Sequence, residues 1–467
     1  MKRLIFISLL VIFAGCKKET MPIDRPPIGA ARVPVANAGP DIVVELPLFS
    51  PVKLNSSESV NFSNREWRKL SGPDFLPFDS VFYDDADLGL WQPGIYSFEL
   101  SVGNRSIVSK DTVNIVVKNS TICGDIPETV TMLSKNTKEL SISDGTAIFL
   151  TVDNQVVSHN TEYYLDEPSR RIAIYDIPSE KLETFELENS VYQTSVANTS
   201  TAFYMAGGYK NSSTSNSFYS DNVSIYDKNL HIWSVGKLSE AREQLTSISA
   251  GDLVFFAGGY NSSGPSATVD IYNQLTKKWT SSKLSEARQN MLAITNGLKI
   301  YFAGGTQGDG LSNKIDIYDI ATGLWSVEQL TDRLYNLKGF FADDKVYFAG
   351  YRDTGSKNKV VVEIKDLNGH PLGMSCLPTG ISGGTQEAIL STDQFIMVPG
   401  FALSSYASMI NLFDKKTGKW KLLVPQKSGP LRLFPSDCLI TYNNKIYGLV
   451  TNEFTARNTQ YLFTIDL

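Results

Sequence analysis

The chain has 467 residues, 42% of them hydrophobic, and a formal net charge of −6. This length allows two to four domains with sizeable buried cores. Because no long basic run offsets the acidic balance, the sequence excludes recognition of a nucleic-acid backbone or of an anionic membrane surface through charge.

Residues 1–15 are typical of an export signal. Lys2 and Arg3 precede an apolar run over residues 4–13, too short to span a bilayer, and Ala14-Gly15-Cys16 follows directly. The pattern resembles a bacterial lipoprotein signal, in which the chain is cut before the cysteine and the cysteine is lipidated. The resemblance implies a chain exported and lipid-anchored through Cys16 to the bacterial outer membrane, on its periplasmic or cell-surface side. A plain secretory signal is the alternative.

Residues 16–33 hold Pro22, Pro26 and Pro27 and have no apolar periodicity, so they are predicted to form an extended tether.

Residues 34–118 alternate apolar and polar side chains in their last two runs, as half-buried strands of a sandwich do. The motifs, in order, are Val35-Ala36-Asn37-Ala38-Gly39-Pro40-Asp41, Leu54-Asn55-Ser56-Ser57, Trp67, Leu70-Ser71-Gly72-Pro73, the run 94–102 and the run 111–117. This segment resembles a PKD domain, an immunoglobulin-like β-sandwich. The resemblance implies a spacer or adhesion module without chemistry, with Trp67 and Tyr96 in its core.

Residues 223–350 contain a repeat. Its landmarks are Ile225-Tyr226-Asp227, Trp233, Leu238-Ser239-Glu240-Ala241-Arg242 and Phe256-Ala257-Gly258-Gly259, which recur as Ile271-Tyr272, Trp279, Leu284-Ser285-Glu286-Ala287-Arg288 and Phe302-Ala303-Gly304-Gly305. Trp325 continues the series, at a period of about 46 residues. Short strands repeated at such a period predict a β-propeller.

The repeat extends over residues 119–467. Equivalent third-strand positions are Tyr175, Tyr226, Tyr272, Tyr318, Ile364, Phe413 and Ile465. With its Gly-Gly pairs and spaced Tyr and Trp, the segment resembles the kelch family. The fold class predicted is therefore all-β: a PKD-like β-sandwich followed by a seven-bladed kelch-type β-propeller, with six blades as the alternative. Residues 128–133 are expected to supply the outer strand of the last blade, and residues 140–144 the first strand of the first blade.

Strand parity places the inter-blade loops and the second-to-third-strand loops on one face of the predicted ring. Candidate binding residues there are Glu240, Arg242, Glu286, Arg288, Asn290, Arg333 and Asn336. Repeated arginines near a channel mouth could present fork-shaped donors to carboxylates or sugar hydroxyls. The alternative is that each arginine pairs with a nearby Glu or carbonyl and only fastens adjacent blades.

Signals of catalysis are sparse. The three histidines, His159, His231 and His370, form no metal-binding or nucleophile motif. Cys123, Cys376 and Cys438 give no disulfide framework. The sequence predicts no metal and no cofactor.

The sequence favours a non-enzymatic exported lipoprotein whose propeller binds a glycan or a protein at the cell envelope. Two alternatives stay open: a carbohydrate-active kelch propeller such as a sialic acid mutarotase, for which Arg and Glu around the channel are the family's catalytic groups, and a purely structural surface component.

Overall fold

The computed structural model describes residues 33–46, 52–75, 81–90, 92–104, 107–119, 128–131, 134–140, 147–152, 155–160, 171–186, 194–210, 218–308, 310–352, 359–375, 377, 389–392, 394–402, 407–424, 439–442, 445–452 and 459–466. The predicted signal, Cys16 and most of the tether lie outside these ranges. Within them the chain is all-β, with many antiparallel sheets and no helix. No stretch of the described chain forms a helix with the length and hydropathy needed to cross a bilayer.

The first sheet has the order β1-β7-β6-β3-β4, and a two-stranded ladder joins β2 to β5. The bounds are β1 (Ile42–Glu45), β2 (Val52–Lys53), β3 (Asn64–Ser71), β4 (Val81–Phe82), β5 (Asp87–Leu88), β6 (Gly94–Asn104) and β7 (Ile107–Lys118). In β6 buried residues alternate with half-buried ones from Tyr96 to Val102, the pattern expected when one face of a strand packs on a core.

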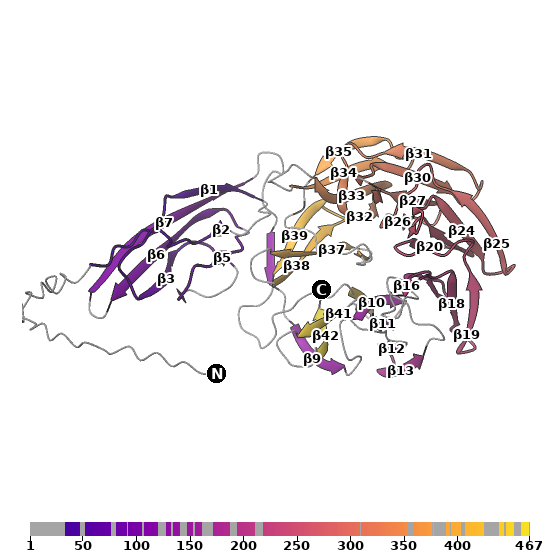
Figure 1. Ribbon diagram of the computed structural model, residues 1–467, viewed down its shortest axis with the longest axis horizontal. Helices are drawn as coiled ribbons and strands as arrows, with labels where there is room; N and C mark the ends of the chain where they lie inside the picture. Colours follow the sequence, from indigo (N-terminus) through magenta and orange to yellow (C-terminus); the bar gives the residue numbers. More distant parts are fainter. Residues whose placement is uncertain are drawn as a thin grey trace, which may run out of the picture.

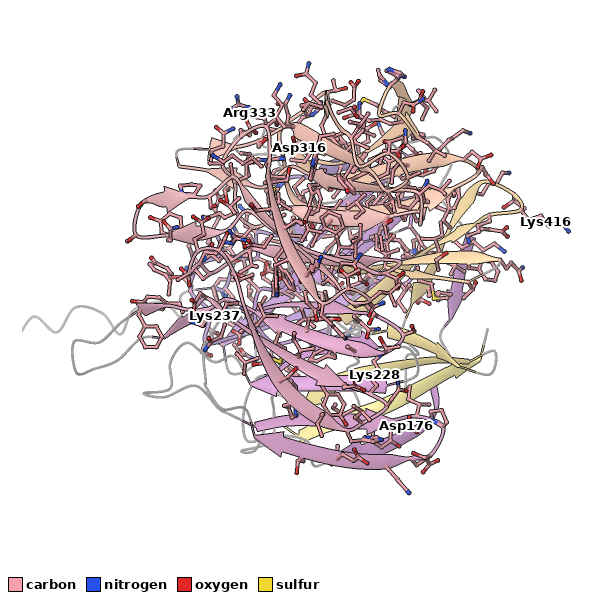
Figure 2. All side chains as sticks on the ribbon, turned by 90° about the vertical axis from the view of Figure 1, so that its right-hand side faces the viewer. Asp176, Lys228, Lys237, Asp316, Arg333 and Lys416 are labelled. Carbon is pink, nitrogen blue, oxygen red and sulfur yellow. The ribbon has the colours of Figure 1, made fainter. Side chains whose placement is uncertain are left out.

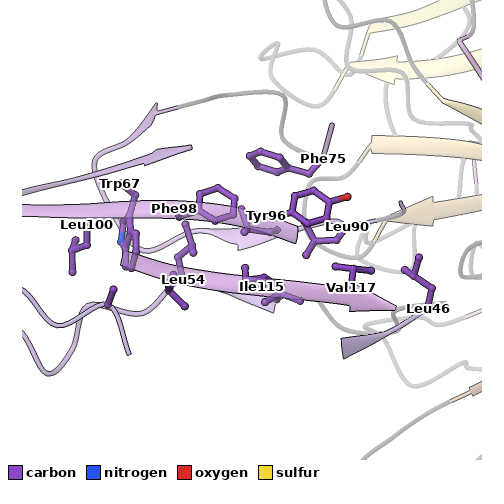
Figure 3. Packing of buried hydrophobic residues seen from close by; sticks show 14 of the residues in the cluster. Leu46, Leu54, Trp67, Phe75, Leu90, Tyr96, Phe98, Leu100, Ile115 and Val117 are labelled. Carbon is purple, nitrogen blue, oxygen red and sulfur yellow. The ribbon is translucent and has the colours of Figure 1, made fainter. Parts of the chain in front are cut away.

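Figure 3 shows that core. Trp67 and Tyr96 are both fully buried in it, as the sequence predicted, and their polar atoms have partners. The indole Nε1 of Trp67 donates to Asp85 at 3.1 Å, and the Tyr96 hydroxyl donates to the carbonyl of Gln92 at 2.8 Å. Leu422, a residue far along the chain, also packs against this cluster.

The rest of the described chain is a succession of seven sheets, each with at least four strands, which we call the sheet array (Figure 1). Its strands are β10 (Ala147–Val152), β11 (Gln155–Asn160), β12 (Arg171–Asp176) and β13 (Lys181–Glu186) in the first sheet; β14 (Ser195–Asn198), β15 (Ala202–Ala206), β18 (Asn222–Asp227) and β19 (Ile232–Lys237) in the second; β20 (Thr246–Ala250), β21 (Leu253–Ala257), β24 (Thr268–Asn273) and β25 (Lys278–Lys283) in the third; β26 (Leu292–Thr295), β27 (Lys299–Ala303), β30 (Lys314–Asp319) and β31 (Trp325–Gln329) in the fourth; β32 (Leu334–Ala342), β33 (Lys345–Arg352), β34 (Lys359–Asp366) and β35 (Pro371–Ser375) in the fifth; β36 (Leu390–Ser391), β37 (Phe395–Ala402), β38 (Ala407–Asp414), β39 (Lys419–Val424) and β8 (Glu128–Thr131) in the sixth; and β40 (Leu439–Tyr442), β41 (Lys445–Asn452), β42 (Thr459–Asp466) and β9 (Ser134–Leu140) in the seventh.

The sheets are arranged like the blades of a propeller. The first strands of successive sheets, β14, β20, β26 and β32, pack against one another, so they form the inner side of the array. The second strands, such as β21, are buried on both faces, and the fourth strands, such as β25, are mostly exposed. Burial is therefore greatest in the second and third strands, intermediate in first strands such as β20, and least in the fourth strands.

Aromatic side chains fill the space between sheets. Trp279 lies 4.8 Å from Tyr272 and 5.8 Å from Phe256, centroid to centroid, in a cluster that also includes Tyr204 of the preceding sheet. Trp325 is 5.9 Å from Phe302 in the next cluster. The repeated tryptophans are thus inter-sheet core residues, as the sequence indicated.

The strands that close the array differ from the prediction. Residues 128–133 were expected to edge the last sheet, but β8 pairs in parallel with β39 of the sixth sheet. The last sheet is completed by β9, which pairs antiparallel with β42. The first sheet accordingly begins with β10, and Leu140, which was expected to open that sheet, belongs to β9; residues 141–144 lie outside the described ranges. Two short adjacent strands carry no local signal that says which edge each will join, because pairing over such a separation depends on tertiary packing.

One equivalence also shifts. Phe348 pairs with Glu363 as Phe302 pairs with Asp316. Ile364 is therefore the counterpart of Ile317, and Lys365 takes the place of Tyr318. The strand is correctly located but its register is displaced by one residue, which a motif match with an aliphatic residue in place of tyrosine could not detect.

Candidate functional site

Two kinds of loop meet on one face of the sheet array. Small hairpins stand between the second and third strands of three sheets: β16 (Tyr209–Lys210) with β17 (Phe218–Tyr219), β22 (Tyr260–Asn261) with β23 (Gly264–Pro265), and β28 (Thr306–Gln307) with β29 (Gly310–Leu311). Isolated β-bridges join Glu243 to Tyr260 and Gln289 to Thr306. Since Glu243 and Gln289 belong to the inter-sheet loops, both loop types lie together, and we call this surface the loop face.

The Gly-Gly pairs allow this meeting. Gly258 has φ +63° and Gly259 has φ +109°, conformations that favour glycine. A Cβ on Gly259 would lie 2.7 Å from the carbonyl oxygen of Glu243, and one on Gly258 would clash with the carbonyl of Arg288. The Gly259 N–H donates to that same Arg288 carbonyl at 2.8 Å. This pair therefore fits the backbone of its sheet against both the inter-sheet loop before it and the one after it.

Arg242 is fully buried between two sheets. Its Nη2 donates to Asp270 of β24 at 2.7 Å and to the carbonyl of Phe256 at 3.0 Å, while Nη1 donates to Glu240 at 2.9 Å. The backbone N–H of Ser239 reaches the other oxygen of Asp270 at 3.2 Å. The loop is thus tied to the sheet that it precedes.

Arg288 repeats the arrangement one sheet further on. Its guanidinium is fully buried, pairs with Asp316 of β30, and donates to the carbonyls of Gly304 and Lys314, each at 2.9 Å. Burial lowers the pKa of Arg288 below its ordinary value, against the opposing effect of Asp316 and Glu286. Such a buried ion pair is stable only when the two groups are well aligned. Removing one partner leaves the other charge buried without a counter-ion.

Glu240 and Glu286 belong to the same network. Glu240 accepts from Ser266, and Glu286 accepts from Ser312 in the equivalent position. Burial by itself would raise the pKa of Glu240, but hydrogen bonds from Ser266 and Arg242 outweigh it and hold this pKa below its ordinary value. The four residues Glu240, Arg242, Glu286 and Arg288 occupy the places of fasteners between sheets, the alternative that the sequence had left open.

Arg333 is different because it is exposed (Figure 2). In the fifth sheet, Leu334 takes the buried position of Arg288. Glu363, the counterpart of Asp316, forms its ion pair with Lys365 at 2.9 Å instead. Arg333, one residue earlier, lies beside Gly310 of the β28–β29 hairpin. Of the three predicted arginines, it is the one whose side chain is exposed.

Asn290 and Asn336 share an unusual backbone conformation. Together with Gln244 they stand two residues after the three successive positions 242, 288 and 334, and their φ angles are +52°, +51° and +53° for Asn290, Asn336 and Gln244. We call these three the amide rim. Left-handed conformations of residues other than glycine cost on the order of 1 to 3 kcal/mol and cluster at functional sites. The amides also connect, since Asn290 Nδ2 donates to Gln244 Oε1 at 2.9 Å.

Tyrosines lie beside the loop that carries Gln244, at one end of the amide rim. The rings of Tyr209 and Tyr219 are 5.2 Å apart, and Tyr219 is 6.4 Å from Tyr260 of the next sheet. Glu243 is bridged to Tyr260 through two backbone hydrogen bonds of 2.9 and 2.8 Å. Because directly opposed residues of an antiparallel pair extend to the same side, the Glu243 carboxylate and the Tyr260 ring share one surface.

Sequence reasoning located this face but missed Glu243, Gln244, Gln289, Tyr219 and Tyr260. A signal was present: the two residues after each repeated arginine are polar in both copies, although no strand needs them to be. The left-handed backbone and the tyrosine contacts arise only when neighbouring sheets meet.

The two histidines whose side chains the structure describes have different partners. His231 contacts the hydroxyl of Tyr226 at 2.9 Å, and His370 contacts Asp366 at 3.0 Å. The side chain of His159 lies outside the described structure. No group of three or more His, Cys, Asp or Glu residues suited to a metal ion occurs in the part of the chain that the structure describes.

No family model matches the chain, and no curated protein matches it. Among solved structures, 425 chains are similar. One, titled "Structure of YjhT", has a TM-score of 0.44 and 11% sequence identity, and the match covers 61% of this chain and 99% of that one.

Proposed function

We propose that this protein is a non-enzymatic binding module of the cell envelope that binds a glycan on the loop face. In this proposal the sheet array is a seven-bladed kelch-type propeller whose last blade is completed by β9, and residues 34–118 are a PKD-like spacer. The export signal would place a lipid on Cys16 and tether the chain to the outer membrane.

The amide rim is the observation that carries the glycan proposal. Three carboxamide side chains stand at the same place in successive repeats, on strained backbone, next to an inner strand. Carboxamides offer donors and acceptors together, which is what sugar hydroxyls require. The nearby rings of Tyr219 and Tyr260 supply apolar surface with polar tips, the mixture found in small-ligand sites.

The arginines divide between two roles. Arg242 and Arg288, with Glu240 and Glu286, position the loops that carry the amide rim. Arg333 is exposed beside the β28–β29 hairpin and would contact the ligand directly. Asn290 and Asn336 are the other two predicted residues assigned to contact.

A glycan array probed with the exported chain tests the proposal. The variants Asn290→Gly and Asn336→Gly remove the amides while suiting the positive φ, so folding is retained. We expect each to weaken binding to the same glycans about tenfold or more, the loss of one to two well-placed hydrogen bonds. Ser262→Ala, on an exposed hairpin tip, is the control and should bind as the parent does.

Three results would replace the proposal. Silence on the array together with capture of a protein that the two Asn variants no longer bind would make the partner a protein. Accelerated interconversion of free sugar anomers, followed by NMR, would make the chain an enzyme. Silence in all three measurements would leave a structural component.

A further inference from the structure

Among the side chains that the structure describes, no cation pairs with the carboxylate of Glu243. In the residues that the structure describes, it forms neither an ion pair nor a side-chain hydrogen bond, although it is half-buried. The adjacent Arg242 is committed elsewhere, since its guanidinium is buried on Asp270 and Glu240. A half-buried carboxylate without a partner is costly, because burial penalises its charged form.

Three tyrosine rings lie on the same side as this carboxylate. Tyr260 is paired with Glu243 across the isolated bridge, and Tyr219 and Tyr209 continue the row from the neighbouring hairpin. Burial raises the pKa of the Tyr219 hydroxyl, and the nearby negative charge of Glu243 raises this pKa further. Aromatic faces attract cations, and the attraction strengthens when the cation is partly shielded from water.

A second acceptor without a donor lies in the next loop. The side-chain oxygen of Gln289 is shielded from solvent and accepts no hydrogen bond from the described chain. Gln289 occupies the position of Glu243 in the following repeat, and the two loops touch, since the Asn290 N–H donates to the Gln244 carbonyl at 3.1 Å. Of the two acceptors, the carboxylate of Glu243 is the one that is only half-buried, and the Gln289 oxygen lies inside the fold.

We propose that Glu243 and the tyrosines Tyr219 and Tyr260 form a subsite for the protonated amine of an amino sugar. The inference rests on the proposed glycan function and narrows its ligand class. An ammonium group supplies three donors and a positive charge, so it satisfies the carboxylate of Glu243 and an adjacent ring face together. A carboxylate sugar would meet repulsion here, and a neutral hydroxyl would leave the charge of Glu243 uncompensated.

The subsite has a defined dependence on pH. Among the described side chains, the titratable groups near Glu243 are Tyr219 and Tyr260, with Tyr209 next to Tyr219, while Arg242 faces the interior. Burial raises the pKa of Glu243 above its ordinary value. Affinity for an amine should therefore fall as the pH is lowered through this raised pKa, because the protonated acid no longer attracts the cation.

Chitosan tetrasaccharide and its fully N-acetylated counterpart are a matched pair of probes, because acetylation removes the positive charge. Binding of both to the full chain is measured by calorimetry at a pH where the free amines are protonated. We expect the chitosan probe to bind about tenfold more tightly, with a preference that weakens as salt rises. Glu243→Gln should reduce the preference to about twofold or less while leaving the N-acetylated probe unaffected.

Glu183→Gln, at an exposed site on β13, is the control and should keep the parent's preference. Equal binding of both probes by the parent, or a preference that Glu243→Gln leaves unchanged, would overturn the amine subsite while the glycan function stands. Failure of both probes to bind would also overturn the amine subsite. The glycan array would then test the glycan function separately.

Discussion

Replacing Arg288 by leucine should destabilise the sheet array strongly. The change leaves Asp316, 2% exposed on its side chain, without its cation, and removes the donors that reach the carbonyls of Gly304 and Lys314. Breaking one side of a buried ion pair costs about 3 to 5 kcal/mol. Leucine itself fits such a position, because Leu334 is buried at the equivalent place in the next sheet. The loss should therefore come from the stranded charge and not from poor packing.

Urea unfolding followed by tryptophan fluorescence measures the effect, since Trp279 and Trp325 report on the adjoining inter-sheet clusters. A loss of this size lowers the midpoint by about 1 M or more. Arg333→Leu is the matched control, an exposed arginine whose loss should change stability by no more than about 0.5 kcal/mol.

The double variant Arg288→Leu with Asp316→Asn removes both charges. It should be more stable than the sum of the two single losses predicts, by about 1 kcal/mol or more, because the stranded charge is gone. The reasoning is refuted if Arg288→Leu costs less than about 1 kcal/mol, or if the two losses simply add.

Four further results are expected. Gly258→Ala should destabilise by more than about 2 kcal/mol, because its Cβ would clash with the Arg288 carbonyl, whereas Gly251→Ala, at a similar φ of +57° in open space, should lose only about 1 kcal/mol in the same urea assay. Asn290→Ala should be less stable than Asn290→Gly by about 1 kcal/mol, since φ is +52° there and alanine does not suit it; equal stability of the two would contradict a strained rim. Because the folded-state pKa of Glu240 is lowered, its contribution is present above the ordinary carboxylate pKa and lost as the pH falls through the lowered value; Glu240→Gln should flatten the acid side of the stability profile, and an unchanged profile would count against this. Deleting residues 134–140 should abolish cooperative unfolding of the array, because β42 would lose its outer partner; an unaltered transition would show that β9 is dispensable.

The repeat could be recognised in the sequence because its repeated residues are required by local backbone conformation and by packing. Gly258 and Gly259 need conformations that other residues resist, and Trp279 fills a space that Trp233 and Trp325 fill in the neighbouring repeats. Such requirements leave the same residue types at a fixed period, so the strands, their order and the loop face could be predicted without coordinates. The strand around Ile364 was found but placed one residue out of register, because an aliphatic residue carries less positional information than tyrosine.

By itself the sequence determined the all-β class, the period of the sheets and the face on which polar loops gather, since alternation and glycine placement are properties of neighbouring residues. Tertiary structure alone decided that β8 and β9 complete two different sheets, that Arg288 is buried while Arg333 is exposed, and that Glu243 faces tyrosines from another sheet. The physical reason is that burial and charge pairing depend on which surfaces come together in space, and residues distant in the chain carry no local record of that meeting.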